Sequence, residues 1–335
     1  MNNRLISLDV YKGISIIAIT LLHFENGVFT PLVSVFIGSF MIAAFYFCAG
    51  WVAGSRSDEY SEKEFLLKRV VALGKTYLWF SLIYIVFDII LLCFGYYDFK
   101  YLAREIYKTL TLRGIGTLWF LPALVLSELL FYFSKRKGFW WVVAIFVLAV
   151  IYRQYYNGIW MAKWRNTSDL MKIIDAPFRT ISNVLGAFTT YSISYYAAKQ
   201  YKKNEIKLTN SIKLVIMIGC LAAYIFSFFV NIRLGVIGGL LINYLLLVGM
   251  FILSYFLSKV SLLKDFFVFW GVNSLGMMVT HYSIILVLFE IFNYYCMKNQ
   301  EFTGTITLYY FIVAFMLQYP IVNFINKKAK FLIGK

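Results

Sequence analysis

Seven ionisable side chains fall within otherwise apolar stretches of the sequence, and they are the natural candidates for chemistry. They are Asp9, Lys12, His23, Asp88, Glu128, His281 and Glu290. Charged groups in hydrocarbon are costly and usually face a cavity or a partner, so each of them is a candidate site. Both histidines of the chain are in this set. Histidine is the side chain best suited to accept a proton near neutral pH, so His23 and His281 are candidate bases.

The spacing of Lys12 and His23 places them on one face of a helix. They are eleven residues apart, which at about 3.6 residues per turn aligns them to within about 20° and separates them by about 16 Å along the axis. Lys12 is then expected near one membrane surface and His23 much deeper. Asp9 precedes Lys12 by three residues and can pair with it, which lowers the cost of a cation at that depth. An ordinary interfacial ion pair is the alternative interpretation of Asp9 and Lys12.

His23 and His281 are expected at one depth in the membrane. Each lies about 15 residues from the inner end of an outward-running span, which corresponds to about 22 Å. If the two helices are neighbours, both imidazoles face one cavity, and Glu128 lies near the middle of the bilayer. The alternative is that each histidine is an ordinary core residue with its hydrogen bonds satisfied, and the residues alone leave both open.

The composition determines the class of protein that must position these groups. Of the 335 residues, 61% are apolar and only 14% are charged, which excludes a soluble enzyme. Runs of near-spanning length predict an all-α integral-membrane bundle of about ten transmembrane helices, with both termini cytoplasmic, as a single domain over 1–335 without a separate soluble domain. The expected spans are 8–29, 32–54, 77–95, 117–134, 139–157, 178–198, 212–230, 234–257, 266–292 and 305–326.

The net charge of +16 is explained by topology. About two thirds of the Lys and Arg residues fall on the side of the membrane that carries the termini, as the positive-inside rule requires. We therefore expect no nucleic-acid partner. Two loops on the other side, 96–116 and 158–177, are longer than a tight connection needs, and the second carries Trp160, Trp164 and Arg165. Anchoring at the membrane interface is favoured over stacking on sugar rings for these aromatic residues.

Four motifs, in order along the chain, resemble those of the membrane-bound acyltransferase 3 family. Arg4-Leu5-Ile6-Ser7-Leu8-Asp9-Val10-Tyr11-Lys12-Gly13 followed by His23 resembles its opening signature. The other three are Phe45-Tyr46-Phe47-Cys48-Ala49-Gly50-Trp51, Leu118-Trp119-Phe120-Leu121-Pro122-Ala123-Leu124, and Gly271-Val272-Asn273-Ser274-Leu275 with His281. Together they cover nearly the whole chain.

The resemblance implies an O-acyltransferase of the cell (inner) membrane. Such an enzyme moves an acyl group, usually acetyl, from cytoplasmic acyl-CoA to a hydroxyl of a glycan, and this sequence is most similar to acetylases of O-antigen, capsule and other surface or lipid-linked sugars. The implied partners are acyl-CoA, that acceptor and the lipid bilayer; acetyl-CoA is a substrate, and no tightly bound cofactor is expected. Lys12 stands where many members have arginine, and of the family's two arginines at the third span only Arg69 matches, because Ala72 occupies the second position.

The residue pattern and the family resemblance together predict a passage through the membrane, with His23 at the place where the acyl donor and the acceptor meet. His23 acts as general base or accepts the acyl group itself, and the sequence leaves the two routes open. An apolar bundle favours the neutral imidazole that can accept a proton. The expected catalytic residues are His23, Asp9 and Lys12. The phosphates of acyl-CoA are assigned to Lys12, Arg69 and Lys68, and substrate binding to Glu128, Asn273, Ser274 and His281; hydrogen bonding between helices is the alternative role of the last three. No metal site is expected.

Two other functions are compatible with ten spans and buried ionisable groups. A proton-coupled transporter or a flippase for lipid-linked sugars uses similar residues, but the inverted repeat of many carriers is absent from the sequence. A scaffold for polysaccharide assembly is the third possibility. The acceptor, the acyl group and the oligomeric state are not determined by the sequence.

Overall fold

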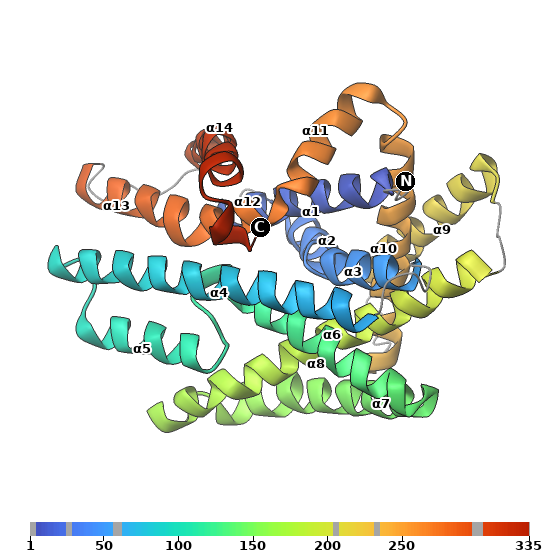
Figure 1. The fold of residues 1–335 in the computed structure, drawn as a ribbon, viewed down its shortest axis with the longest axis horizontal. Helices are drawn as coiled ribbons and strands as arrows, with labels where there is room; N and C mark the ends of the chain where they lie inside the picture. The colour runs from blue at the N-terminus through green and yellow to red at the C-terminus, as the bar shows by residue number, and fades with distance from the viewer. Residues whose placement is uncertain are drawn as a thin grey trace. The chain divides into compact units, whose positions relative to one another are not determined.

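The computed structural model describes residues 5–24, 29–55, 62–203, 208–230, 235–296 and 304–334. Arg4, the first residue of the opening motif, lies outside them. The described chain contains helices and no strand, which confirms the all-α prediction. The α-helices are α1 (Ile6–Phe24), α2 (Pro31–Phe40), α3 (Ala43–Ser55), α4 (Glu62–Cys93), α5 (Phe99–Leu110), α6 (Phe120–Lys137), α7 (Phe139–Tyr155), α8 (Asp169–Lys203), α9 (Asn210–Phe229), α10 (Gly235–Leu257), α11 (Ser261–Val272), α12 (Ser274–Thr280), α13 (Val287–Cys296) and α14 (Gly304–Lys328) (Figure 1).

Four short helical segments join or end these helices. Two are 3₁₀ turns, η1 (Gly116–Trp119) and η4 (Lys330–Ile333), and two are π-helical, η2 (Tyr156–Trp164) and η3 (His281–Leu286). π-Helical turns inside helices are often found at functional sites. One of the two here begins at a candidate residue, His281.

The chain forms two compact units, each built from two separate segments. Unit 1 comprises Met1–Ser55 and Ser194–Val322, and unit 2 comprises Arg56–Ile193 and Asn323–Lys335. Helices α8 and α14 each contribute residues to both units. In unit 1, α1 packs against α2, α3, α10, α11 and α12. In unit 2, α4 packs against α5, α6 and η4, and α6 packs against α7.

Nine helical segments of the described chain are long and apolar enough to cross a membrane. They agree with nine of the ten expected spans. The exception is the expected span 178–198, which lies inside the long helix α8. That helix carries Asp175, Pro177 and Arg179 near its beginning, and α8 is not among the apolar segments. The multi-pass membrane architecture is thus supported.

The expected span 266–292 is interrupted, because α11 ends at Val272 and α12 begins at Ser274. Asn273 lies between them, and its amide Nδ2 donates a hydrogen bond to the backbone oxygen of Phe269 at 2.8 Å. Asparagine side chains compete for backbone groups in this way and so favour helix ends. The apolar segment that continues from the break, Ser274–Tyr295, contains His281.

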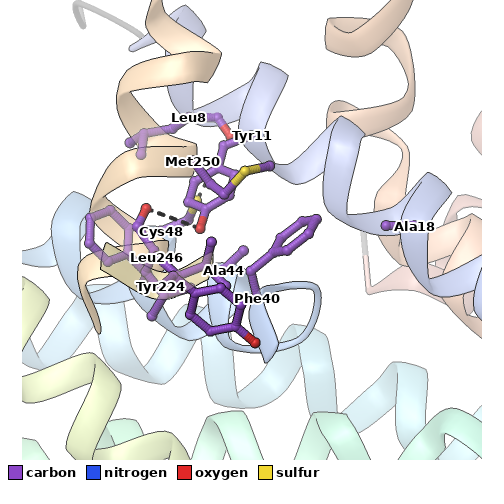
Figure 2. Packing of buried hydrophobic residues seen from close by; sticks show 11 residues of the cluster. Leu8, Tyr11, Ala18, Phe40, Ala44, Cys48, Tyr224, Leu246 and Met250 are labelled. Carbon is purple, nitrogen blue, oxygen red and sulfur yellow. Dashed lines mark hydrogen bonds between the residues drawn. The ribbon is translucent and has the colours of Figure 1, made fainter. Parts of the chain in front are cut away.

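A buried cluster in unit 1 fixes the position of α1. Tyr11, one residue before Lys12, is fully buried. Its ring lies 6.0 Å from that of Phe47 on α3, and its hydroxyl donates a hydrogen bond to the backbone oxygen of Leu247 on α10 at 3.2 Å. Figure 2 shows side chains of α1, α2, α3, α9 and α10 converging around it. Tyr11 therefore ties the helix that carries His23 to its neighbours by packing and by one directional bond.

Two glycines allow α1 and α11 to approach closely. A Cβ atom placed on Gly271 would collide with the backbone oxygen of Asp9, and one on Gly13 would collide with the backbone oxygen of Phe267. Only a residue without a side chain fits at such a contact between membrane helices. The glycine that opens the Gly-x-Asn-Ser motif is thus required for packing against the first helix.

We expect Gly271→Ala to destabilise the protein. The added methyl group forces α11 away from α1, and overpacking of this kind costs about 1–3 kcal/mol. Thermal unfolding in detergent should show a lower midpoint. The matched control is Gly219→Ala on α9, where nothing lies within 4 Å of the added atom and alanine improves helix propensity. Equal midpoints for the two variants would contradict the close approach.

Candidate functional site

The two histidines of the chain are hydrogen-bonded to each other. His23, in the last turn of α1, places its Nδ1 3.0 Å from Nε2 of His281, the first residue of η3. The ring centroids are 5.0 Å apart, and the planes are inclined by 44°. The two imidazoles, expected to come near each other if their helices were neighbours, are thus in contact, although the helix carrying His281 is broken at Asn273. Their common depth in the membrane stays a prediction.

The hydrogen bonds define which ring nitrogens carry protons. Nδ1 of His281 lies 2.9 Å from the backbone oxygen of Met277, and a carbonyl oxygen can only accept, so this nitrogen is protonated. In a neutral imidazole the other nitrogen, Nε2, then bears a lone pair. That lone pair accepts from Nδ1–H of His23. When His23 is neutral as well, its Nε2 carries no proton and is the basic, nucleophilic nitrogen of the pair.

Burial separates the roles of the two rings. His281 is completely buried and has a hydrogen-bond partner at each nitrogen. His23 is only partly buried. The ring of Tyr282 lies 4.9 Å from that of His23. Of the two imidazoles, His23 is the one that a substrate can reach.

A fully buried glutamine lies beside this pair and was not expected from the sequence. Gln318 on α14 accepts a hydrogen bond at Oε1 from the hydroxyl of Thr280, the residue before His281, at 2.8 Å. Its Nε2 and the hydroxyl of Ser283 are buried without a hydrogen-bond partner in the described chain. The sequence interpretation considered only ionisable side chains within apolar stretches, and an amide is not ionisable. The sequence signal that marks Gln318 is a polar, uncharged side chain within an apolar stretch.

Asp9 and Lys12 form the expected ion pair. The ammonium nitrogen of Lys12 lies 2.8 Å from Oδ1 of Asp9. Asp9 is buried, whereas 29% of the Lys12 side chain is exposed. An ammonium group has three donors, so pairing with a single carboxylate oxygen leaves donors for an anion arriving from the exposed side.

Arg69 and Glu128 form an ion pair that the sequence did not predict. Nε of Arg69 donates to Oε2 of Glu128 at 2.9 Å, and Nη2 lies 2.7 Å from Oε1, a bidentate arrangement. Glu128 is almost completely buried, whereas 30% of the Arg69 side chain is exposed. Both residues belong to unit 2, and Lys68 is exposed on the same helix as Arg69. Two residues with separately expected roles, one for phosphate and one for the acceptor, thus contact each other.

Asn273 and Ser274 lie at the break before α12. The side chain of Asn273 is bound to the backbone of α11, as described above, and Ser274 is buried at the first position of α12. His281 follows two turns later. These residues shape the segment that presents His281, and their expected contact with substrate stays a prediction.

Comparisons with known proteins agree with this geometry. The family model described as an acyltransferase domain, that of the acyltransferase 3 family, matches residues 5–322 and so covers both units and both histidines. Neither the curated proteins nor the solved structures give a significant match. The chain carries the paired histidines within a match that spans nearly its whole length, and it belongs to the acyltransferase 3 family.

Proposed function

We propose that this membrane acyltransferase moves an acyl group, most simply acetyl, from cytoplasmic acyl-CoA to a hydroxyl of a cell-surface or lipid-linked glycan. The observation that carries the proposal is the hydrogen-bonded pair of His23 and His281. It leaves one accessible basic nitrogen, Nε2 of His23, in a chain of an acyltransferase family. Acyl transfer to an alcohol requires such a nitrogen, either to take the hydroxyl proton or to attack the thioester.

In the first route, His23 acts as general base. Nε2 takes the proton of the acceptor hydroxyl while the oxygen attacks the thioester carbonyl. The tetrahedral intermediate then collapses, the bond to sulfur breaks, and the same proton passes from Nε2 to the departing CoA thiolate. His281 holds Nδ1–H of His23 throughout, so the imidazole keeps the tautomer and orientation that the transfer needs. The orienting group of a catalytic triad acts in this way.

In the second route, Nε2 attacks the thioester and becomes acylated as the CoA thiolate leaves. The acylated ring gives up its Nδ1 proton to Nε2 of His281, which the hydrogen bond already places 3.0 Å away. The acceptor hydroxyl then attacks the acyl group and the bond between the acyl carbon and Nε2 of His23 breaks. The proton on Nε2 of His281 returns to Nδ1 of His23, and the hydroxyl proton passes to the CoA thiolate, which restores both rings. Both routes depend on the lone pair of His281, and this shared dependence is what the site predicts.

We assign the CoA phosphates to the exposed cations. Lys12 has donors to spare beyond Asp9, and Lys68 is exposed on α4. The bidentate bond to Glu128 occupies part of the guanidinium of Arg69. A phosphate therefore meets Arg69 only at its exposed edge. In our proposal Glu128 serves to hold Arg69, and Lys68 contributes more to phosphate binding within unit 2 than Arg69 does.

Substitution of each histidine should separate the reacting ring from the positioning ring. We expect His23→Ala to reduce transfer by about 10²–10⁴, the usual contribution of a general base. His281→Leu should give a large loss because it removes the acceptor for Nδ1–H, and His281→Gln should retain more activity because an amide oxygen can accept that bond. The assay measures label from acetyl-CoA incorporated into the glycans of membranes that contain each variant.

The control for a merely structural effect is the pH profile together with the folded yield. Loss of the His281 lone pair should change the pH dependence of transfer in His281→Leu, which a packing defect alone would not do. Full activity of His23→Ala at normal folded yield would remove His23 from the reaction. Equal losses in the Leu and Gln variants, with unchanged pH profiles, would refute the positioning role of His281.

Lys12→Ala should weaken the binding of acyl-CoA and leave the rate of the chemical step nearly unchanged. We expect a higher acyl-CoA concentration at half-maximal rate with little change in the limiting rate, because the lost contact is made equally in the ground state and the transition state. Lys12→Arg should retain binding. Lys137→Ala, which removes an exposed cation at the end of α6, is the control. A fall in limiting rate at unchanged acyl-CoA dependence would show that Lys12 does not bind the donor.

The Arg69–Glu128 pair predicts a strong coupling in stability. Glu128→Leu alone removes the bidentate partner of the half-buried guanidinium of Arg69, and Arg69→Met leaves the buried carboxylate without that guanidinium. Each single variant should cost about 3–5 kcal/mol. The double variant Arg69→Met/Glu128→Leu should be more stable than either single variant, since it removes both charges together. Thermal unfolding of the four proteins measures this coupling. Additive losses would mean that the two side chains act independently.

A further inference from the structure

The two long loops predicted from the sequence, 96–116 and 158–177, meet at one end of unit 2. The hydroxyl of Tyr107 on α5 donates to the backbone oxygen of Ile173 on α8 at 2.9 Å. The hydroxyl of Thr180 lies 3.1 Å from the backbone oxygen of Thr111. These bonds hold the end of α5, and the segment that follows it, along the first turns of α8. Among the charged residues gathered there, the cations outnumber the acids, and none of them takes part in the site described above.

One acidic residue in this region, Asp175, already has its full complement of partners. Its Oδ1 accepts from the hydroxyl of Tyr156 at 2.9 Å and from the indole Nε1 of Trp160 at 3.0 Å. Its Oδ2 lies 3.1 Å from Nε of Arg165. Trp160 is itself buried and stacked on Phe178, with ring centroids 4.6 Å apart. The charge of Asp175 is thus balanced by Arg165 and held by two neutral donors.

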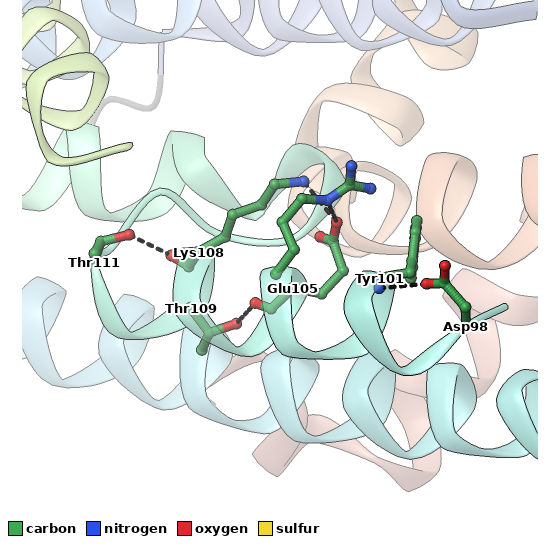
Figure 3. Close-up of polar contacts among 7 residues, drawn as sticks. Asp98, Tyr101, Glu105, Lys108, Thr109 and Thr111 are labelled. Atoms are coloured by element: carbon green, nitrogen blue, oxygen red, sulfur yellow. Dashed lines mark hydrogen bonds and ion pairs between the residues drawn. The ribbon is translucent and has the colours of Figure 1, made fainter. Parts of the chain in front are cut away.

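The other acidic residue near this place, Glu105, is also balanced. Its Oε1 accepts from Lys108 at 2.6 Å and from Nε of Arg104 at 3.3 Å. Figure 3 shows the side chain of Lys108 extending along α5 to the carboxylate of Glu105, which is buried. Arg104 and Lys108 share the single negative charge of Glu105, so this group of α5 side chains carries a net positive charge.

Two further arginines, Arg113 and Arg179, have no such partner. Both are half-buried. Among the described residues, neither guanidinium has a hydrogen bond or an ion pair to a protein group. Burial, followed by repulsion from Arg179, lowers the pKa of Arg113 to about 10. Attraction to Tyr156, Asp175 and Glu105 offsets these two effects only in part. The two arginines therefore repel each other in surroundings that hydrate them poorly, an arrangement that a bound anion would stabilise.

The backbone holds Arg113 in this place at a cost. Leu112 has a φ of 57°, in the left-handed region that side chains rarely adopt, and Gly114 has a φ of 67°. A Cβ atom on Gly114 would also lie 2.6 Å from the backbone nitrogen of Trp119, so the segment has little freedom to relax. Left-handed conformations of residues other than glycine are unfavourable and persist where the surrounding structure enforces them, often at ligand sites.

We infer that Arg113 and Arg179 together bind one phosphate-type oxyanion, either free phosphate or the phosphate group of an anionic lipid. Guanidinium groups offer paired N–H donors that match phosphate oxygens. An anion between them replaces mutual repulsion with two attractions. The neighbouring aromatic residues Tyr107 and Trp164 are partly or largely exposed, as at a membrane interface, which is compatible with a lipid source. The inference does not depend on the acyl-transfer reaction.

The test compares the full-length wild type with Arg113→Gln/Arg179→Gln and with Arg136→Gln. Arg136 is an exposed arginine in the last turn of α6 whose contact is with Tyr132, so its variant is the control for loss of charge. One arm titrates inorganic phosphate against protein in neutral detergent, with sodium chloride at matched ionic strength. The other arm uses nanodiscs of phosphatidylglycerol or of phosphatidylcholine and counts retained lipid by native mass spectrometry.

We expect the double variant to bind phosphate, phosphatidylglycerol or both at least about tenfold more weakly than wild type, and Arg136→Gln to bind like wild type. A difference in the detergent arm identifies the free anion, and a difference confined to the phosphatidylglycerol nanodiscs identifies the lipid. Equal binding by all three proteins in both arms, including no binding by any of them, would overturn the proposal. So would an equal loss in Arg136→Gln.

A single variant covers the case in which the double variant does not fold. Because the two arginines repel each other, Arg179→Gln should have an unfolding midpoint in chloride equal to or above that of wild type, and phosphate should raise it less than it raises the wild-type midpoint. A lower midpoint in chloride, combined with an undiminished response to phosphate, would mean that Arg179 stabilises the fold and does not bind the anion.

Discussion

The hydrogen bond from Nδ1–H of His281 to the backbone oxygen of Met277 is the interaction on which the proposed chemistry depends. It is a local bond, within one turn of a helix, yet it decides the state of both rings. Because the carbonyl oxygen can only accept, Nε2 of His281 carries a lone pair that faces Nδ1–H of His23. The lone pair of His23 is then on its Nε2, the nitrogen that does not contact His281. In hydrolytic triads a carboxylate orients the histidine. Here a second, neutral histidine takes that place, so no buried negative charge is required.

That bond is useful only if the two rings are held at contact distance, and the packing of α1 provides this. Gly13 and Gly271 let α1 approach α11, and Tyr11 ties α1 to α10. Asn273 then separates α11, which makes the close contact with α1, from α12, which leads to His281. The motifs that resemble family signatures thus contain packing residues as well as reacting ones. In the second span motif, Phe47 and Cys48 belong to the buried cluster around Tyr11.

The residues that sequence reasoning identified well are those whose placement is costly in a membrane. Asp9, Lys12, His23 and His281 were identified because a charged or titratable group in hydrocarbon demands an explanation. The 3.6-residue period then predicted the Asp9–Lys12 pair. Counting residues along each helix predicted that the histidines share one depth, and the structure shows that they are hydrogen-bonded to each other.

What could not be predicted depends on which helices are neighbours. The Arg69–Glu128 pair joins α4 and α6, and the bond between Thr280 and Gln318 joins α12 and α14; a helical period contains no information on such partners. An apolar span was expected over 178–198, but helix α8 begins earlier, at Asp169, and its first turns carry Asp175, which is bound by Tyr156 and Trp160 of η2. The break at Asn273 was missed because a single asparagine in an apolar run does not by itself predict a helix end.

The central claim concerns where two protons lie, and the chain contains only two histidines. Nitrogen NMR of protein labelled with ¹⁵N at the histidine ring therefore observes four ring nitrogens and no others of that type. The account predicts that at neutral pH both Nδ1 atoms are protonated and both Nε2 atoms are not, and that His281→Leu removes one pair of signals and alters the Nδ1 signal of His23. A proton on Nε2 of His23 in the resting protein would contradict it.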